Sequence, residues 1–232
     1  MLEVREIHTY YGMSHILFGV CLHVDPGEIV CLLGRNGAGK TATLRSIMGL
    51  TPPRRGSIKF KGEEIVGKEP YKLVRRGMAY VPSDRRIFVD LTVGENLELA
   101  ERKAKGGEGW NKDRVYELFR VLKNIESHKG KSLSGGEQQM LTIGRALMNN
   151  AEFLLLDEPT EGLAPLTIKA LEEQIKKLKE SGLTILLAEQ NVRSALRLSD
   201  RGYIIDKGRI HYQGSIEELR QNEEIRKRYL LI

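Results

Sequence analysis

The chain has 232 residues, of which 41% are hydrophobic and 29% are charged, with a formal net charge of +6. This is the composition of a globular protein that buries a sizeable core. Apolar runs such as "FLLLD" are far shorter than the ~20 residues of a membrane-spanning helix. No secretory signal is visible in the first residues, "MLEVREIH". These features favour a soluble, cytoplasmic protein. The basic residues lie in small scattered groups with few aromatics, as on a solvated surface with a weak bias toward anionic partners, and we expect no nucleic acid as a partner.

The first fifty residues indicate two strands, a turn and a third strand. "LEVREIHTYY" and "ILFGVCLHV" alternate apolar and polar residues, which predicts half-buried antiparallel strands. "DPG" at 25–27 is a turn, and "EIVCLLG" then reads as a buried strand that ends in a glycine loop. Cys21 and Cys31 lie in these segments without metal-ligand spacing, so we expect both to be reduced core residues.

The glycine loop "GRNGAGKT" has the spacing of a phosphate-binding loop between a strand and a helix. Its glycines let the backbone curl so that several N–H groups point at phosphate oxygens. Lys40 supplies a charge for the β- and γ-phosphates, and the Thr41 hydroxyl is a ligand for Mg²⁺. The predicted nucleotide-binding segment therefore comprises Gly34, Arg35, Asn36, Gly37, Ala38, Gly39, Lys40, Thr41 and Ala42.

After a helix at about 40–50 and the strand and turn in "GSIKFKGEEI", the chain becomes helix-rich and charged from Asp84 to Met148. "KGGEG" at 105–109 predicts a loop within this insertion of about 60 residues, which we expect to form a subdomain. "KSLSGGEQQM" at 131–140 has two interpretations. Ser134 with Glu137 fits a capping box, and the bare Gly135–Gly136 turn also fits an anion site at a helix N-terminus.

Two more buried strands follow, "EFLLLDEPT" and "GLTILLAEQN", separated by a helical pattern. This alternation predicts a parallel sheet covered on both faces, with ligands at the carboxyl ends of its strands. Asp157 ends the first of these strands and can hold magnesium through water, while Glu158 can orient or activate the attacking water. The second strand delivers Glu189, Gln190 and Asn191 to the same edge.

In this order, "GRNGAGKT", "LSGGEQQ", "LLLDEPT" and "EGLAP" resemble the ATPase subunit of ABC transporters over essentially the whole chain. The resemblance implies one ABC ATPase domain, 1–232, of the α/β class: a P-loop (RecA-like) parallel-sheet core with an N-terminal antiparallel β subdomain and a helical insertion. The ATP-binding core would comprise about 1–83 and 149–232, and the helical signature subdomain about 84–148.

In that family two ATPase domains pair head to tail, which gives the Gly135–Gly136 turn a role. Ser134, Gly135, Gly136 and Glu137 would then cap the γ-phosphate of an ATP bound to the partner chain, which is compatible with the capping box. Tyr11 resembles the aromatic residue that stacks on adenine, with Tyr10 as the alternative. Thr41, Asp157 and Ser83 take the positions around Mg²⁺, and Glu158 and Gln190 take the catalytic and switch positions.

Four positions depart from the family pattern. Ser83 replaces a Gln or Glu, so a water bridge to the metal is expected instead of direct contact. Ala42 removes a hydroxyl next to the phosphates, and Ala164 replaces an Asp at the expected dimer contact. Gln190 replaces a His, and its amide can donate to the γ-phosphate but cannot take a proton.

"VPSDRRIFVDLTVGENL", "EGLAPL" and "AEQNVRSAL" look most like branched-chain amino acid uptake ATPases, with lipopolysaccharide-export ATPases a near second. The resemblance implies ATP and Mg²⁺ as cofactors and a peripheral place on the cytoplasmic face of the cell membrane. The implied partners are integral membrane permease subunits, a second ATPase chain, the same or related, and indirectly a periplasmic or extracellular solute-binding protein. The apolar residues of 84–97 either contact the permease or pack inside the subdomain.

Two other functions stay open. A soluble ABC-type ATPase acting on nucleic acid or ribosomes would suit the basic charge, but the chain lacks the long coiled coils or tandem ATPase domains typical of that class. An ATP switch with low turnover would suit the departures at Ser83, Ala42 and Gln190.

Overall fold

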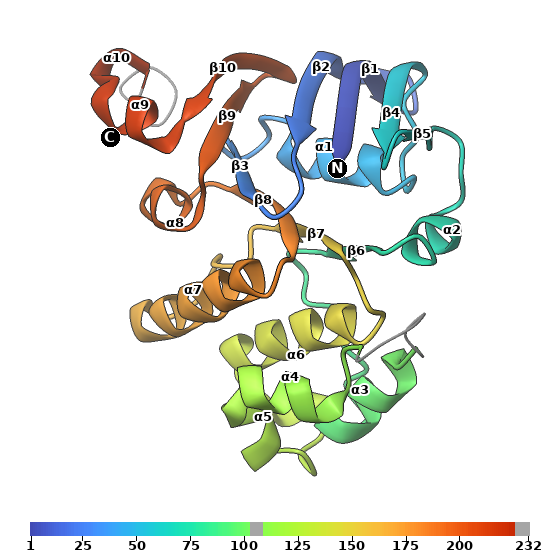
Figure 1. Ribbon diagram of the computed structural model, residues 1–232, viewed down its shortest axis with the longest axis vertical. Helices are drawn as coiled ribbons and strands as arrows, with labels where there is room; N and C mark the ends of the chain where they lie inside the picture. The colour runs from blue at the N-terminus through green and yellow to red at the C-terminus, as the bar shows by residue number, and fades with distance from the viewer. Residues whose placement is uncertain (103–108, 226–232) are drawn as a thin grey trace.

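The computed structural model describes residues 1–102 and 109–225. Most of the predicted loop at 105–109 therefore lies outside the described residues. Two sheets and a group of helices are layered along the long axis of the molecule (Figure 1), with an antiparallel sheet at one end and helices of the insertion at the other. The predicted fold class is confirmed.

The antiparallel sheet has the order β2 (Ser14–Val24), β1 (Leu2–Tyr11), β4 (Arg55–Phe60) and β5 (Glu63–Glu64). The alternation that predicted the first two strands places Val20, Leu22 and Val24 inside. The same alternation turns Cys21 outward, so the prediction that both cysteines are core residues is wrong for Cys21 and right for Cys31. Glu6 contacts the exposed Cys21 thiol through its carboxylate.

The second sheet has the order β10 (Arg209–Ser215), β9 (Arg201–Asp206), β3 (Ile29–Leu33), β8 (Thr184–Glu189), β7 (Phe153–Asp157) and β6 (Met78–Val81). Every residue of β3, β7 and β8 is buried, as expected for central parallel strands with both faces covered. Five strands are parallel as predicted, but β10 pairs antiparallel with β9 at the edge. The β9–β10 hairpin and β6 were not predicted from the sequence.

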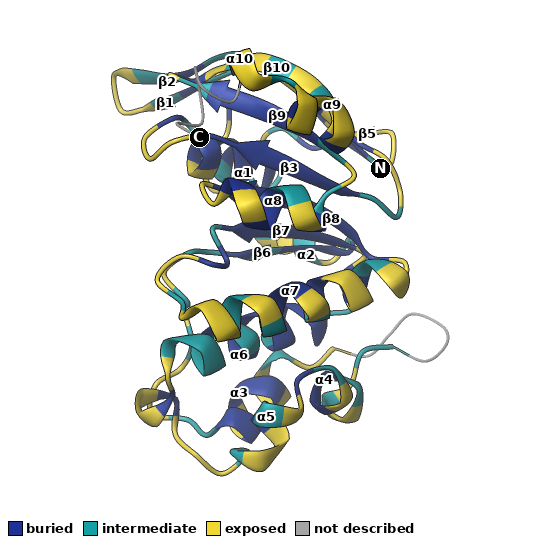
Figure 2. Cartoon of the chain, turned by 90° about the vertical axis from the view of Figure 1, so that its left-hand side faces the viewer, coloured by how far each residue is buried: buried dark blue, intermediate teal, exposed yellow. Residues whose placement is uncertain are grey.

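The helices follow the predicted alternation and cover both faces of the six-stranded sheet (Figures 1 and 2). In chain order they are α1 (Lys40–Ile47), α2 (Pro70–Val74), α3 (Val93–Ala100), α4 (Lys112–Leu118), α5 (Arg120–Asn124), the 3-10 turn η1 (Gly130–Ser132), α6 (Gly135–Leu147), α7 (Pro165–Glu180), α8 (Val192–Leu198), α9 (Ile216–Gln221) and α10 (Glu223–Ile225). Every helix among the described residues is too short or too polar to cross a lipid bilayer.

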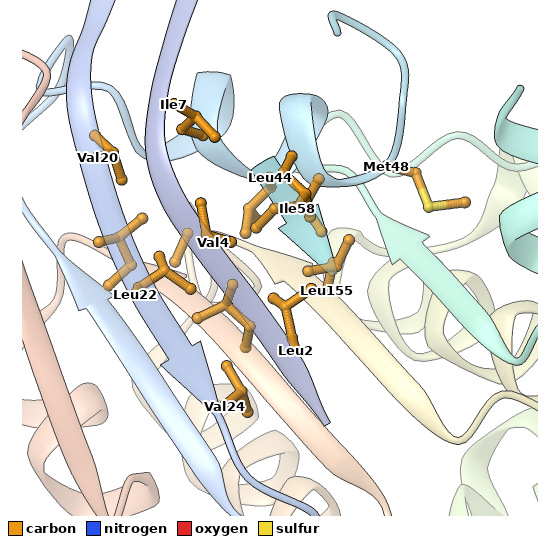
Figure 3. Packing of buried hydrophobic residues seen from close by; sticks show 14 of the residues in the cluster. Leu2, Val4, Ile7, Val20, Leu22, Val24, Leu44, Met48, Ile58 and Leu155 are labelled. Atoms are coloured by element: carbon orange, nitrogen blue, oxygen red, sulfur yellow. The ribbon is translucent and has the colours of Figure 1, made fainter. Parts of the chain in front are cut away.

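The buried apolar residues form three clusters that meet at the six-stranded sheet. The first lies between the two sheets around α1, where Val4, Leu22, Leu44 and Leu155 converge (Figure 3). The second covers the opposite face of the six-stranded sheet and continues without interruption into α6, α7 and the helices of the insertion. The third packs α8 and α9 against β3 and β9, around Cys31.

Candidate functional site

The phosphate-binding loop spans the carboxyl end of β3 and the start of α1. Gly39 precedes α1 with φ +114°, a conformation that L side chains rarely adopt, and a Cβ there would lie 2.9 Å from Leu17 Cδ2. The Gly34 N–H donates to the Glu189 carbonyl at 3.3 Å, so the ends of β3 and β8 meet at this loop. These contacts hold the loop in the curled form that the glycine spacing predicted.

Lys40 lies inside the loop and is only 3% exposed. Its Nζ donates to the carbonyls of Gly34 at 2.8 Å and Arg35 at 3.0 Å. The same Nζ lies 3.0 Å from Glu158 Oε1 in an ion pair that is shielded from solvent. The structure therefore joins the predicted phosphate-binding cation directly to the predicted catalytic carboxylate.

Asp157, at the end of β7, is fully buried and lies beside Thr41. Thr41 Oγ1 donates to Asp157 Oδ1 at 3.0 Å, and the Tyr80 hydroxyl donates to Oδ2 at 2.8 Å. Burial raises the pKa of the Asp157 carboxyl, although these two hydrogen bonds act in the opposite direction. Tyr80, on β6, is a partner that the sequence analysis missed.

The oxygen atoms of Thr41 and Asp157 fit Mg²⁺ as the cofactor of this site. A hydroxyl and a carboxylate oxygen 3.0 Å apart are hard ligands close enough to share one small cation. Ser83 lines the same cleft of about 500 Å³ as Thr41 and Asp157, together with Arg45 and Arg145. The structure thus brings the three predicted metal residues to one cleft.

Glu158 follows β7 with φ +46°, a left-handed conformation that is uncommon for a residue with a side chain. Its N–H donates to the Ala188 carbonyl at 2.9 Å, which fixes the strained residue against the end of β8. Gln190 is exposed one residue beyond β8, next to the loop that Gly34 begins. Both predicted catalytic residues therefore lie at the carboxyl edge of the sheet.

Glu189 is a buried carboxylate that joins the loop after Glu158 to the end of β8. It accepts hydrogen bonds from the Thr160 N–H at 3.2 Å, the Thr160 hydroxyl at 2.7 Å and the Asn191 N–H at 3.1 Å. Burial raises the pKa of Glu189, and these hydrogen bonds offset part of that effect. The sequence placed Glu189 at this edge but did not predict that it holds Thr160.

Tyr11 and Tyr10 are distinguished by their surroundings. The Tyr10 ring already stacks on His15, with ring centroids 4.2 Å apart, and the Arg54 guanidinium lies 4.4 Å from its centroid. Tyr11 is 44% exposed at the end of β1. Of the two candidates for adenine stacking, Tyr11 is the ring with an accessible face.

The turn at Ser134 forms the predicted capping box at the start of α6. The Ser134 N–H donates to Glu137 Oε2 at 2.7 Å, and the Glu137 N–H donates to Ser134 Oγ at 3.3 Å. A Cβ on Gly136 would lie 2.4 Å from Thr167 Cγ2, and one on Gly135 would lie 2.6 Å from Arg85 Nη1. None of these neighbours belongs to the phosphate-binding loop of the same chain. The second interpretation, an anion site completed by another chain, stays a prediction.

Comparisons with known proteins agree with this geometry. The family model described as ABC transporter matches residues 17–161. The chain is 43% identical to the high-affinity branched-chain amino acid transport ATP-binding protein BraG of Pseudomonas aeruginosa, covering 99% of both chains. It is 35% identical to the lipopolysaccharide export system ATP-binding protein LptB of Escherichia coli, covering 99% of this chain and 96% of LptB.

Among solved structures, an ATP-binding cassette of an ABC transporter in its ADP conformation superposes with a TM-score of 0.82 at 26% identity, covering 98% of this chain and 97% of that one. The resemblance of the motifs is confirmed by the match of nearly the whole chain. The chain belongs to the ABC transporter ATP-binding family and is an ATPase of that family.

Proposed function

We propose that this ATPase powers an ABC importer of branched-chain amino acids. The proposed substrate is supported by the 43% identity to BraG across 99% of both chains, compared with 35% identity to LptB. The convergence of Lys40, Thr41, Asp157 and Glu158 at one edge of the sheet supports ATP hydrolysis as the source of energy. Export of lipopolysaccharide is the second candidate because LptB also matches over nearly its whole length.

At the site, we assign the β- and γ-phosphates to Lys40 and the surrounding backbone N–H groups. Thr41 and Asp157 would hold Mg²⁺, with Ser83 reaching it through water; when bound, the ion neutralises phosphate charge. A phosphate that draws Lys40 away would free Glu158 to accept a proton from the attacking water. Gln190, beside the loop, would donate a hydrogen bond to the γ-phosphate, and the exposed face of Tyr11 would stack on adenine.

We further propose that two ATPase chains pair so that Ser134, Gly135, Gly136 and Glu137 of each complete the site of the other. α6 is a helix of thirteen residues, and the two glycines at its N-terminus add no side chain of their own between the backbone N–H groups and an anion. The low-turnover switch would keep this pairing but lose hydrolysis. A role on nucleic acid or ribosomes would need neither the pairing with a permease nor the membrane.

The contact with the permease is proposed on the helical insertion, 84–148. Phe88 is 46% exposed and Val89 is also exposed, whereas Ile87 packs into the second core cluster. Both earlier alternatives for this segment are therefore represented, since some of its apolar residues pack inside and others face out. Arg145 of α6 holds the exposed Phe88 ring, with its guanidinium 4.5 Å from the ring centroid. Docking here would hold the chain on the cytoplasmic face of the membrane.

The test uses the complex of this chain with its permease subunits, purified from native membranes. Reconstituted into vesicles, the complex should hydrolyse Mg-ATP faster when a leucine-loaded solute-binding protein is added, and lipopolysaccharide should have no effect. The control variant Glu158→Gln should bind ATP but show no stimulated turnover, since an amide cannot accept the proton. Stimulation by lipopolysaccharide alone would replace the proposed substrate, and absence of turnover in the intact complex would support the switch.

A further inference from the structure

We propose that the Lys207–Gly208 turn between β9 and β10 is a positioning element for the phosphate-binding loop, and that it fixes the distance between this loop and the strand that follows Tyr11. The turn would thereby set the affinity for ATP through the backbone. This inference rests on the proposed role of Tyr11 in adenine binding.

The two ends of the proposed nucleotide site belong to different sheets. Tyr11 lies in the antiparallel sheet, immediately before β2, whereas the phosphate-binding loop follows β3 of the six-stranded sheet. Gly208 is hydrogen-bonded to both sides. Its N–H donates to the Ala38 carbonyl at 2.8 Å, and its carbonyl accepts from the Phe18 N–H at 2.9 Å. One residue thus connects β2 to the phosphate-binding loop.

The connection depends on close backbone approach. Gly208 has φ +73°, and a Cβ built on it would lie 2.0 Å from the Ile16 carbonyl oxygen and 2.9 Å from Phe18 Cδ2. On the other side, a Cβ on Gly39 would lie 3.3 Å from Gly208 Cα. Neither glycine can carry a side chain unless β2, the turn or the loop moves.

Arg209, the next residue, adds a side chain to the same junction. Its Nη1 donates to the Phe18 carbonyl at 3.5 Å, and its guanidinium lies 5.0 Å from the centroid of the Phe18 ring. The edge hairpin β9–β10 therefore contacts β2 at both backbone groups of Phe18. The Gly208 carbonyl binds its N–H, and the Arg209 side chain binds its carbonyl.

The chain contains a matched control for this turn. Lys61–Gly62 connects β4 to β5 with φ values of +52° and +80°, and Lys207–Gly208 has +45° and +73°. Positive φ at both central residues is the pattern of a type I′ hairpin turn. A Cβ on Gly62 would meet nothing within 4 Å. Alanine at either position imposes the same backbone strain, but only at Gly208 does it also displace neighbouring backbone.

The experiment compares Gly208→Ala with Gly62→Ala in the purified, intact ATPase complex. Gly208→Ala should raise the KM and the dissociation constant for Mg-ATP by about tenfold or more. The kcat should stay within about twofold, since Asp157 ends β7 and Glu158, which follows it, is held by the Ala188 carbonyl of β8. Gly62→Ala should change neither constant by more than about twofold. Equal effects of the two variants, or a loss of kcat at unchanged KM, would refute the positioning role.

Tyr11→Ala separates this inference from the function on which it rests. If Tyr11→Ala leaves the KM unchanged while Gly208→Ala raises it, adenine stacking fails but the turn still positions the phosphate-binding loop. If the parent chain itself binds no ATP, the proposed function fails before the variants are compared.

A measurement on the parent chain covers the case in which Gly208→Ala does not fold. Amide hydrogen exchange followed by NMR should slow at Gly208 when Mg-ADP is added, because the nucleotide orders the loop whose Ala38 carbonyl accepts this hydrogen. The Gly62 amide in the matched turn should exchange at an unchanged rate. Equal exchange rates at Gly208 with and without saturating Mg-ADP would overturn the proposal.

Discussion

Asp157 is a fully buried carboxylate, with Thr41 and Tyr80 as its hydrogen-bond donors. Because burial raises its pKa, the folded chain disfavours the ionised form relative to the unfolded chain. A carboxyl with a raised folded-state pKa contributes stability that is fully present below its unfolded pKa and is lost as the pH rises through its folded pKa. In the nucleotide-free chain, the buried Asp157 carboxylate therefore costs stability at neutral pH.

We expect Asp157→Asn to stabilise the nucleotide-free chain at neutral pH by on the order of 1 kcal/mol, which corresponds to about 2–4 °C in Tm for a chain of this size. Both hydroxyl partners can donate or accept, so the amide fits. The gain should shrink as the pH falls toward the range in which the parent carboxyl is protonated. Thermal unfolding across the acid-to-neutral range measures this, with Glu173→Gln on the exposed face of α7 as control. A gain independent of pH would contradict it.

At the level of single residues, the sequence predicted those whose role is encoded locally. The phosphate-binding loop is contiguous, Asp157 and Glu158 directly follow an apolar run, and Ser134 and Glu137 are three residues apart, so spacing alone places them. Tyr80 and Gly208 were missed because their partners, Asp157 and Ala38, are distant in sequence. Only the fold brings these pairs together.

At the scale of one element, α6 begins with a capping box at the turn that we propose to complete the partner's site. In a Glu158→Gln background, Mg-ATP should produce a dimer, and Ser134→Arg should prevent it because its bulk and charge block closure over the partner's nucleotide. The loss of the helix cap alone costs roughly 0.5–2 kcal/mol and must be controlled for.

Ser215→Arg supplies that control, since Ser215 and Glu218 form the same capping box at the start of α9. Size-exclusion chromatography with light scattering should show the Mg-ATP dimer for Glu158→Gln alone and with Ser215→Arg, and a monomer with Ser134→Arg. Dimerisation with Ser134→Arg as strong as with Ser215→Arg would leave the turn as a helix cap only.

Elements were predictable where their patterns were regular. Alternation marked β1 and β2, and uninterrupted apolar runs marked β3, β7 and β8. β6 has only four residues, too few for a reliable period. The β9–β10 hairpin did carry a signal, the Lys207–Gly208 pair between two strand-forming segments, which is the kind of two-residue turn that joins antiparallel strands.

At the scale of the whole molecule, the helical insertion and one face of the six-stranded sheet share a single apolar core. A permease that docks on Phe88 would therefore act on α6 and on β7 through packed side chains, without a flexible joint between them. Such packed layers transmit displacement because they contain few voids.

We expect Phe88→Asp to release the chain from membranes while Mg-ATP binding is unchanged. Phe88 is 46% exposed, so the substitution removes the contact of its ring with the Arg145 guanidinium but no fully buried packing, and it introduces a charge at the proposed apolar contact. Membrane flotation and nucleotide titration measure the two properties. Met13→Asp, at a residue 90% exposed in the turn between β1 and β2 of the antiparallel sheet, is the control and should remain on membranes. Equal membrane binding of both variants would move the docking surface away from Phe88.

The ion pair between Lys40 and Glu158 has a consequence for the order of events in the ATPase cycle. On the roles proposed above, the base pairs at 3.0 Å with the same cation that would bind the phosphates. In the nucleotide-free enzyme, Glu158 would therefore compete with the phosphates for Lys40. Arrival of the triphosphate and release of the base would then be one exchange of partners, so that water would not be activated before the substrate has bound.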